Sequence, residues 1–414
     1  MLPRLVVQWP RLGPYHLARL RATHERFVRE GWGVTALETA GTDRTYAWRE
    51  ETAPEPFVRE QIFPGSTYDA LAPSAIHRGV TMALDRIDPD AVAINSYAGT
   101  DAQAALVWCR RRRRTAVCFM ESTAADAARA PGREWAKGRI VKAFDSALAG
   151  GSPQRAYVVR LGVPDARVFE PYDVVDNAFF ESGAARARAD MARTLPGLGD
   201  DRPFFLASNR FVARKNLARL IEAFAAFREG GGPPWRLVLL GDGPEREALD
   251  RLVAERRVPD VTFAGFQQIE ALPDYYAHAG AFVHPALVEP WGLVINEALA
   301  CGLPVVASDR VGAAADLVRD GVTGFQFDPE LTDVLTGLLG RLAGMSDDER
   351  RKMGENGRAV VAGWSPEQFA KGLWSAVLAG REVADRGLPL VAGALLWAQR
   401  TAARRPDSFH TLRE

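Results

Sequence analysis

Residues 281–307 read AFVHPALVEPWGLVINEALACGLPVVA, and this stretch has the clearest structural pattern of the chain. Two short apolar runs at its ends, 281–284 and 304–307, are typical of buried β-strands. Between them, residues 293–300 form an apolar run that indicates a helix. Because two strands joined by a helix pair in parallel, the stretch predicts a parallel sheet covered by helices.

The same alternation continues on both sides of this stretch, in two successive halves. In the first half we predict strands at 5–7, 34–37, 91–94, 115–119 and 147–149, and helices at 15–30, 70–88, 101–113 and 134–144. In the second half we predict strands at 204–207, 236–240, 261–263, 281–284 and 304–307, and helices at 216–227, 245–255, 269–278 and 293–300.

A chain of 414 residues exceeds what one hydrophobic core usually supports. We therefore predict an α/β protein of two doubly wound parallel-sheet domains, 1–175 and 176–365, joined by a linker within 173–202. Ligands of such sheets bind at the carboxyl ends of the strands. The expected site is a cleft between the two domains.

Composition excludes several classes of function. Hydrophobic residues make up 47% and charged residues 25% of the chain, as in ordinary globular proteins. The formal net charge is zero, which argues against electrostatic binding of nucleic acid. Cys109, Cys118 and Cys301 lack metal-ligand spacing and are interpreted as reduced, small apolar residues of a cytoplasmic protein.

The ends of the chain carry no recognisable membrane span. No export signal is visible at the N-terminus. The apolar run 388–398 is about half of the roughly 20 residues that a spanning helix needs. Two interpretations stay open for this run and the arginines after it: contact with a membrane surface, or an amphipathic tail docked on the protein, which is favoured.

Two carboxylates, Glu289 and Glu297, lie eight positions apart around a Pro-Trp-Gly turn before the apolar helix. Burying an unpaired charge costs several kcal/mol, so each carboxylate needs a polar partner, and sugar hydroxyls are suitable. The amides of 291–294 would point along the helix axis at its positive dipole end, which favours an anion such as a diphosphate. A sugar nucleotide fits both requirements.

Arg210 and Lys215 follow the strand at 204–207, at a turn into a helix. Arginine can bind phosphate oxygens through two parallel hydrogen bonds, and lysine acts as a point charge. A merely solvated helix start would disfavour cations at the positive end of the dipole. We therefore interpret the two residues as ligands of a phosphate.

Two further loops of the second half are less specific. Gly241 and Gly243 follow a predicted strand, and glycine suits either a tight turn or a close approach to a ligand. The dinucleotide fingerprint would need a third glycine at Arg246. Phe266 and Gln267 follow another strand, where the pair could contact a nucleobase or the phenyl ring could belong to the core. Both alternatives stay open for each loop.

Taken in order, these motifs resemble the retaining glycosyltransferases of family 4 (group 1), which have the GT-B fold of two Rossmann-like domains. The resemblance covers most of the second half. It depends on Arg210 with Lys215, GDGP at 241–244, VTFAG at 261–265, the Glu289 and Glu297 pair, GLPVVAS at 302–308 and DGVTG at 320–324. The first half is looser, with PRLGPYH at 10–16, GGS at 150–152, YVVRLG at 157–162 and DVVDNAFF at 173–180.

The resemblance implies transfer of a sugar from a nucleotide-diphosphate sugar to an acceptor hydroxyl, in cell-surface polysaccharide, glycolipid or metabolite glycosylation. Arg210, Lys215 and Glu289 would be catalytic: the cations would stabilise the leaving diphosphate, so that no metal or cofactor is needed, and Glu289 would hold the sugar. Glu297 would accept hydrogen bonds from the ribose. Further donor contacts are implied for Gly13, Gly241, Gly243, Phe266, Gln267, Trp291, Gly292 and Leu293. The C-terminal helix, about 366–414, would pack back on the first domain.

The chain departs from the family pattern in two places. Residues 312–316 read GAAAD, where many members have paired glycines before a glutamate, so we expect a stiffer loop. Glu121 stands where many members have a histidine; contact with the donor sugar or acceptor is open for Glu121 and His16, and so is a purely structural role. His284 is interpreted as packing at a strand end.

Alternatives to the transferase remain. One is another GT-B enzyme such as a sugar-nucleotide epimerase, and another is a non-catalytic sugar-nucleotide-binding protein. The run Arg110 to Arg114 closes a predicted helix, where the negative dipole end favours cations. A solvated surface is the favoured interpretation of this run, and contact with acidic lipid is the alternative.

Overall fold

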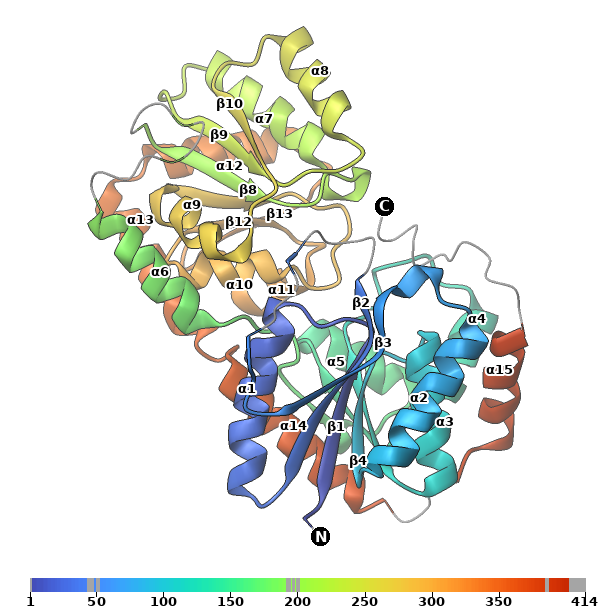
Figure 1. Cartoon of the computed structure of the whole chain (residues 1–414). Helices are drawn as coiled ribbons and strands as arrows, with labels where there is room; N and C mark the ends of the chain where they lie inside the picture. The colour runs from blue at the N-terminus through green and yellow to red at the C-terminus, as the bar shows by residue number, and fades with distance from the viewer. Residues whose placement is uncertain are drawn as a thin grey trace. The chain divides into compact units, whose positions relative to one another are not determined.

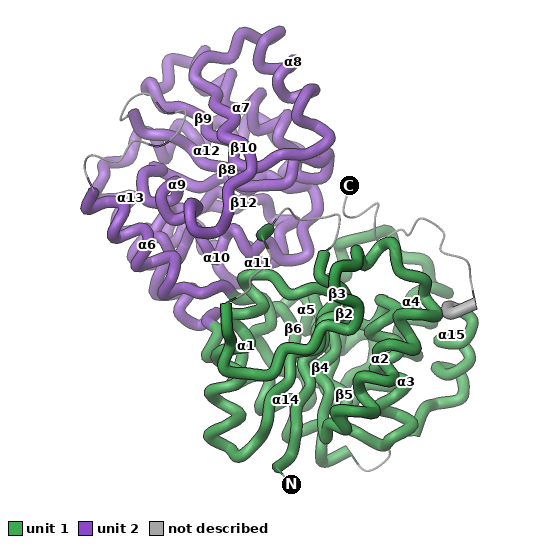
Figure 2. The backbone as a smooth tube through the Cα atoms, in the orientation of Figure 1, with its two compact units in different colours: residues 1–174, 366–408 green, residues 175–365, 409–414 purple. Residues whose placement is uncertain are grey.

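The computed structural model describes residues 2–42, 48–49, 53–190, 195, 198, 202–383 and 387–401. They form two compact units (Figures 1 and 2). Unit 1 contains the chain up to Val174 and the chain from Pro366 onward as far as it is described, and unit 2 contains Val175–Ser365. Most of the Gly- and Pro-containing part of the predicted linker, and the predicted terminal segment beyond 401, lie outside the described residues.

Unit 1 is built on a sheet in the order β3-β2-β1-β4-β5-β6-β7, in which all strands pair in parallel. Its strands are β1 (Arg4–Trp9), β2 (Gly33–Thr42), β3 (Val58–Thr67), β4 (Ala91–Asn95), β5 (Thr115–Met120), β6 (Ser146–Ala149) and β7 (Val168–Phe169). The prediction missed the two edge strands, β3 and β7. Strand β3 is half-exposed and contains Pro64, and β7 has two residues, so neither carries a clear apolar pattern.

Helices lie on both faces of the sheet (Figure 1). They are α1 (Pro14–Arg29), α2 (Pro73–Ile87), α3 (Thr100–Arg112), α4 (Pro131–Val141), α5 (Ser152–Leu161), α14 (Pro366–Arg381) and α15 (Leu390–Thr401). Helices α1, α2 and α4 begin with proline, whose fixed φ suits the first helical position.

Helix α14 returns to unit 1 from the end of unit 2 and packs on α1, β5 and β6. Gly372 and Gly380 face the sheet, where a Cβ would lie 2.7 Å from the Glu170 carbonyl and 2.7 Å from Thr115, respectively. Ser146 Oγ donates to the Ala376 carbonyl at 2.7 Å. The helix is therefore part of the core of unit 1.

Unit 2 contains the sheet β10-β9-β8-β11-β12-β13, also parallel throughout. Its strands are β8 (Phe204–Ser208), β9 (Arg236–Leu240), β10 (Val261–Gly265), β11 (Ala281–His284), β12 (Val305–Ser308) and β13 (Gly324–Phe327). The last of these was missed, because four residues that include a glycine and a glutamine give a weak signal. The prediction of two doubly wound parallel-sheet domains is confirmed.

The helices of unit 2 are α6 (Asn177–Ala189), α7 (Leu217–Glu229), α8 (Arg246–Arg256), α9 (Leu272–His278), α10 (Leu293–Ala300), α11 (Gly312–Leu317), α12 (Thr332–Gly344) and α13 (Asp347–Val361). Helices α7 and α12 pack together, as do α6 and α9. The predicted stiff loop at 312–316 is instead the start of α11. Three alanines in succession favour the helix at this point.

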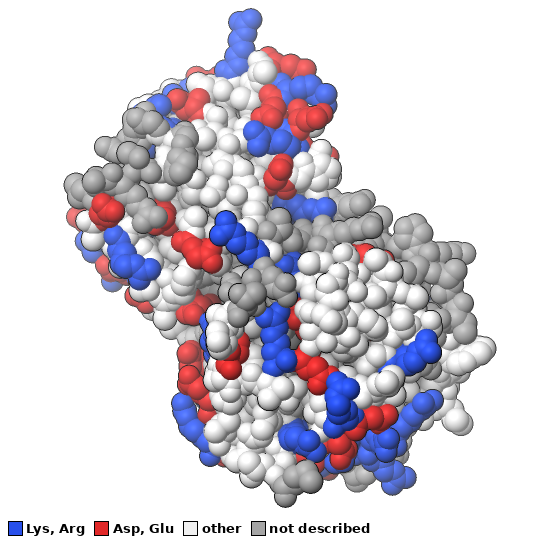
Figure 3. Space-filling view, in the orientation of Figure 1, with Lys and Arg blue, Asp and Glu red and all other residues white. Residues whose placement is uncertain are grey.

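Burial and charge agree with the composition. Cys109, Cys118 and Cys301 are buried and unbridged, as predicted. On the face shown in Figure 3, cations and carboxylates are interspersed. No helix of the described residues is both long and apolar enough to cross a bilayer.

The arginine run is partly buried rather than solvated. Arg110 is 4% exposed, and its Nη1 donates to Asp145 Oδ1 at 2.9 Å. Arg112 Nη2 lies 2.7 Å from Asp85 Oδ1, and Arg114 Nη2 lies 2.8 Å from Asp88 Oδ1. The prediction of a solvated surface was therefore wrong for Arg110, because its acidic partner lies on a distant part of the chain.

Candidate functional site

In both units the strand order reverses at one point of the sheet, between β1 and β4 in unit 1 and between β8 and β11 in unit 2. Parallel sheets bind ligands beside the carboxyl ends of the strands at such points. Gly13 and His16 follow β1, Lys215 follows β8, and Glu289 follows β11. The topology therefore brings Lys215 and Glu289 to the same end of the sheet of unit 2, where its parallel strands end.

Lys215 and Glu289 are in direct contact. Lys215 ends the short 3₁₀ turn Ala213–Lys215, and its Nζ donates to Glu289 Oε2. Arg214 Nη1 lies 3.5 Å from the same carboxylate oxygen and donates to the Val288 carbonyl at 3.2 Å. Two cations thus converge on one carboxylate. Arg214 was not assigned a role from the sequence, and its position next to Lys215 was the available signal.

The electrostatics of this cluster favour an ionised carboxylate. Burial alone would raise the pKa of Glu289, but the charge of Lys215, with contributions from His284 and Arg214, holds the pKa well below its ordinary value. Burial also lowers the pKa of Lys215, and Glu289 opposes that effect. At neutral pH Glu289 is therefore a carboxylate, able to accept hydrogen bonds and unable to donate one.

His284, at the end of β11, is fully buried beside the same carboxylate. Its Nε2 lies 3.6 Å from Glu289 Oε2. Burial lowers the pKa of the imidazole, so His284 is neutral at pH 7. The ring is packed at a strand end, as interpreted from the sequence. The proximity of His284 to Glu289 was not predicted. The signal for it was that Glu289 follows His284 by only five residues, just after the end of β11.

Backbone contacts join the loops after β8 and β11. The Leu287 amide donates to the Arg214 carbonyl at 2.8 Å. Asn216, in the left-handed conformation with φ +58°, donates from Nδ2 to the carbonyls of Pro285 and Pro329 at 3.1 Å each. Asparagine tolerates this conformation better than most residues. These bonds fix Lys215 at the loop that carries Glu289.

The Pro-Trp-Gly turn is held by hydrogen bonds to α11 and α10. Gly292 has φ +97°, and a Cβ there would lie 3.3 Å from Glu289 Cγ. The Glu289 carbonyl accepts from the Gly312 amide at 3.0 Å, and Trp291 Nε1 donates to Asn296 Oδ1 at 2.9 Å. Helix α10 begins directly after, at Leu293. The first amides of a helix have no partner within the helix, so they can donate to a ligand.

Glu297 lies inside α10 and is only 1% exposed. Tyr276 donates from its hydroxyl to Glu297 Oε2 at 2.7 Å. The two carboxylates therefore have different surroundings: cations at Glu289 and a phenol hydroxyl at Glu297. Among the described residues, no group of three or more His, Cys, Asp or Glu has a metal-binding arrangement.

Gly241 and Gly243 pack on the loop that carries Arg210. The Asp242 carbonyl accepts from the Phe211 amide at 2.9 Å, and the Gly241 amide donates to the Gly265 carbonyl at 2.8 Å. A Cβ at Gly241 would lie 1.8 Å from the Asn209 carbonyl oxygen, and one at Gly243 would lie 2.5 Å from that of Phe211. The structure therefore shows a packing role for these glycines, and a close approach to a ligand stays a prediction.

Gly241→Ala is expected to lower the free energy of unfolding by about 3 kcal/mol or more. At φ +121° a side chain is strained, and the Asn209 carbonyl leaves it no space. Urea denaturation would measure the change. Gly337→Ala is the matched control: no atom lies within 4 Å of its added Cβ, and alanine in a helix interior is expected to stabilise by about 1 kcal/mol. Equal stability of the two variants would contradict the packing role.

The loop after β10 contains the two residues predicted to meet a nucleobase. Gly265 has φ +72°. Phe266 is 38% exposed, so it is not a core residue. Gln267 Nε2 donates to the Ala264 carbonyl at 2.7 Å. The exposed Phe266 ring rules out the interpretation of Phe266 as a core residue, and contact with a nucleobase stays a prediction.

In unit 1 the loop after β1 is also held in place. The Leu12 amide donates to the buried Glu38 Oε1 at 2.8 Å, and the Gly13 amide donates to His16 Nδ1 at 3.0 Å. Burial of His16, with the charges of Arg19 and Arg11, lowers its pKa to about 3. His16 therefore serves as a neutral acceptor at the start of α1. Glu121, after β5, is exposed.

His16 is expected to make unit 1 less stable in mild acid. Its folded pKa lies below the unfolded value of 6.5, so between pH 6.5 and 3 the unfolded chain binds more protons and stability falls as the pH falls. From pH 7 to 5 the contribution is about 2 kcal/mol. His16→Gln keeps an acceptor without a titrating group. Urea denaturation at both pH values should show a smaller loss in this variant, and parallel losses would contradict the assignment.

Comparison with known proteins finds similarity to glycosyltransferases over part of the chain. Residues 192–360 match the model of the glycosyl transferases group 1. The chain is 33% identical over 202 residues to alpha-D-kanosaminyltransferase from Streptomyces kanamyceticus. The aligned segment covers 48% of this chain and 51% of that protein. It is 36% identical over 197 residues to a GDP-mannose-dependent phosphatidylinositol monomannoside mannosyltransferase from Mycolicibacterium smegmatis, over 45% and 50% of the two chains. The chain thus spans about half the length of these curated relatives.

Solved structures resemble a larger share of the chain than these relatives do. Sucrose-phosphate synthase from Thermosynechococcus elongatus has a TM-score of 0.69 at 24% identity, over 90% of this chain and 97% of that one. HepE from Anabaena, solved with UDP and glucose, has a TM-score of 0.66 at 18% identity, over 90% and 98%. The fold is GT-B. Within unit 2, residues 192–360 are similar to the glycosyl transferases group 1.

Proposed function

We propose that the protein is a cytoplasmic, retaining glycosyltransferase of family 4 that transfers a sugar from a nucleotide-diphosphate sugar to an acceptor hydroxyl. The observation that carries the proposal is the convergence of Lys215 and Arg214 on Glu289 where the strand order of unit 2 reverses. The family match covers the same unit. An ionised carboxylate and cations side by side suit a ligand with hydroxyls next to a diphosphate.

In the proposed reaction, the diphosphate lies against Lys215 and Arg210. The bond between the sugar C1 and the diphosphate oxygen breaks, and negative charge grows on the leaving group. Fixed cations stabilise that charge as it develops, and this is usually the largest contribution to catalysis. The cations make a metal unnecessary. We therefore propose a metal-independent reaction.

Glu289 holds hydroxyls of the donor sugar, and the amides of Trp291, Gly292 and Leu293 lie against the diphosphate. Glu297 accepts from the ribose hydroxyls, and Phe266 with Gln267 flanks the base. The acceptor oxygen bonds to C1 on the face that the diphosphate leaves, and its proton passes to the departing phosphate. The anomeric configuration is therefore retained without a protein nucleophile.

Unit 1 is proposed to bind the acceptor. Gly13 lies in the loop after β1 at the point where the strand order of unit 1 reverses, and glycine allows a ligand to approach its backbone closely. The resemblance makes a polysaccharide, a glycolipid or a small metabolite the class of acceptor.

Two measurements test the proposal. Calorimetric titration with UDP, GDP and ADP should find one tightly bound nucleoside diphosphate. Mass spectrometry and NMR of reactions with the matching donor should then show a new glycoside of retained configuration only when an acceptor is present, with the rate unchanged by EDTA. Donor conversion without an acceptor would indicate an epimerase, and binding without conversion a non-catalytic protein; either result would overturn the proposal.

A further inference from the structure

Helix α15 presents an apolar surface on its outer side as well as its inner side. Residues 387–398 read GLPLVAGALLWA and contain no charged residue. The inner side chains Ala392 and Leu396 are each 1% exposed in the core of unit 1. On the outer side, Leu390 is 92% exposed and Trp397 is 65% exposed. A helix that is apolar all round is normally buried all round, so a partner for the outer side is expected.

Helix α4 packs against α15 and adds an aromatic ring and cations. Trp135, Arg139 and Lys142 are all exposed and follow a spacing of four and three residues, which places them along one stripe of the helix. Trp135 is 53% exposed, and the Arg139 guanidinium lies 5.3 Å from the centre of its ring. Apolar and cationic groups are therefore neighbours on the outside of unit 1.

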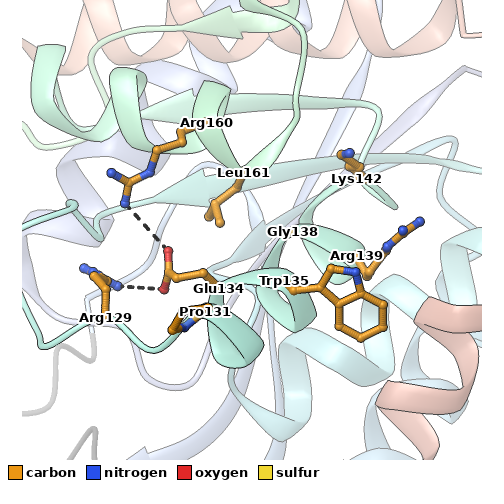
Figure 4. Close-up of a pocket in the computed structure, with 9 residues that line it drawn as sticks. All are labelled: Arg129, Pro131, Glu134, Trp135, Gly138, Arg139, Lys142, Arg160 and Leu161. Atoms are coloured by element: carbon orange, nitrogen blue, oxygen red, sulfur yellow. Dashed lines mark hydrogen bonds and ion pairs between the residues drawn. The ribbon is translucent and has the colours of Figure 1, made fainter.

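A cavity of about 490 Å³ lies between α4 and α5, and Trp135, Arg139 and Lys142 belong to its lining. Its lining has four cations, Arg129, Arg139, Lys142 and Arg160, and one carboxylate, Glu134. Glu134 lies 3.3 Å from Arg129 Nη1 and 3.7 Å from Arg160 Nη2. Figure 4 shows Arg139 and Lys142 farther along the helix from this carboxylate. The lining is therefore strongly cationic in a chain whose formal net charge is zero.

We propose that Trp135 and Arg139 of α4 and Lys142 at its C-cap, with Leu390, Val391 and Trp397 of α15, form a docking face for the surface of an anionic lipid bilayer. The apolar side chains of α15 enter the interface, and the cations bind lipid phosphates. Tryptophan is enriched at this depth because its ring is apolar and its N–H is polar. A second copy fits the face less well, because a two-fold contact would bring two cationic surfaces together. The inference does not rest on the proposed function.

Vesicle sedimentation with the full chain tests the docking face. We expect the wild type to bind vesicles containing phosphatidylglycerol, more weakly at high salt, and to bind phosphatidylcholine vesicles poorly. Arg139→Gln with Lys142→Gln should weaken binding about 30-fold, because each cation at the surface contributes about fivefold. Leu390→Ser with Trp397→Ser should weaken it at least about tenfold. The replaced side chains are exposed, so folding should be unchanged by circular dichroism.

Control variants on unit 2 remove an exposed apolar residue and an exposed cation, Val334→Ser and Lys352→Gln, and should bind vesicles as the wild type does. Equal binding of the wild type to both kinds of vesicle would overturn the proposal. So would a dimer in light scattering that Leu390→Ser with Trp397→Ser converts to a monomer, because a second copy would then cover α15. Binding of glycerol phosphate without binding of vesicles would assign the cations to a soluble ligand and would also overturn it.

Discussion

Lys215→Ala is expected to weaken the binding of the nucleoside diphosphate by about 100-fold or more. The substitution removes a cation that is proposed to bind the diphosphate. It also removes the positive charge that stabilises the buried Glu289 carboxylate. Like charge then faces the incoming phosphate. Calorimetric titration would measure the dissociation constant.

Lys352→Ala, on α13, is the matched control, because this lysine is exposed and lies outside the site. Lys215→Arg keeps a charge at the position and should recover part of the affinity. Thermal unfolding would separate a loss of binding from a loss of structure. An unaltered dissociation constant for a folded Lys215→Ala would reject the role proposed for this residue.

Glu289→Gln is expected to lower kcat by about a thousandfold. The amide has the size of the carboxylate but not its charge, so it no longer holds the sugar hydroxyls as a strong acceptor. Lys215 loses its anionic partner at the same time and becomes fully available to a diphosphate. The affinity for the nucleoside diphosphate should therefore stay the same or rise while turnover falls.

Release of nucleoside diphosphate from the donor gives kcat, and titration gives the affinity. Glu330→Gln is the matched control, because Glu330 pairs with Arg310 at the surface of unit 2. A parallel loss of turnover and affinity would indicate a structural role for Glu289. A kcat equal to that of the wild type would remove Glu289 from the reaction.

The sequence predicted the interior strands well and the edges poorly. Strand β9, RLVLL, is buried at every position, so its composition alone identifies it. Strand β3 is half-exposed at the edge of its sheet, and β7 and β13 are too short for a pattern. Stability at an edge comes from pairing with a neighbouring strand, which one segment of sequence does not reveal.

The candidate site was predictable in its members and less so in its contacts. Lys215 and Glu289 both follow strands of one parallel sheet, so the sequence places them at one edge although 74 positions separate them. The sequence does not show that His284 and Arg214 both lie beside the Glu289 carboxylate. The directions of these side chains depend on the geometry of the turns that follow the strands. For the same reason Arg110 was predicted to face water, whereas Asp145 pairs with it in the interior.

The return of α14 to unit 1 has a consequence for synthesis on the ribosome. The described part of unit 2 is one continuous segment, and Asn177 near its start donates to the carbonyls of Val361 and Trp364 near its end. Unit 1 lacks a core helix until residues 366–381 have been translated. Folding of the chain up to Val174 therefore has to wait for residues 366–381, whereas Val175–Ser365, which is made between them, can fold earlier. A premature stop codon after position 365 would consequently damage the amino-terminal unit.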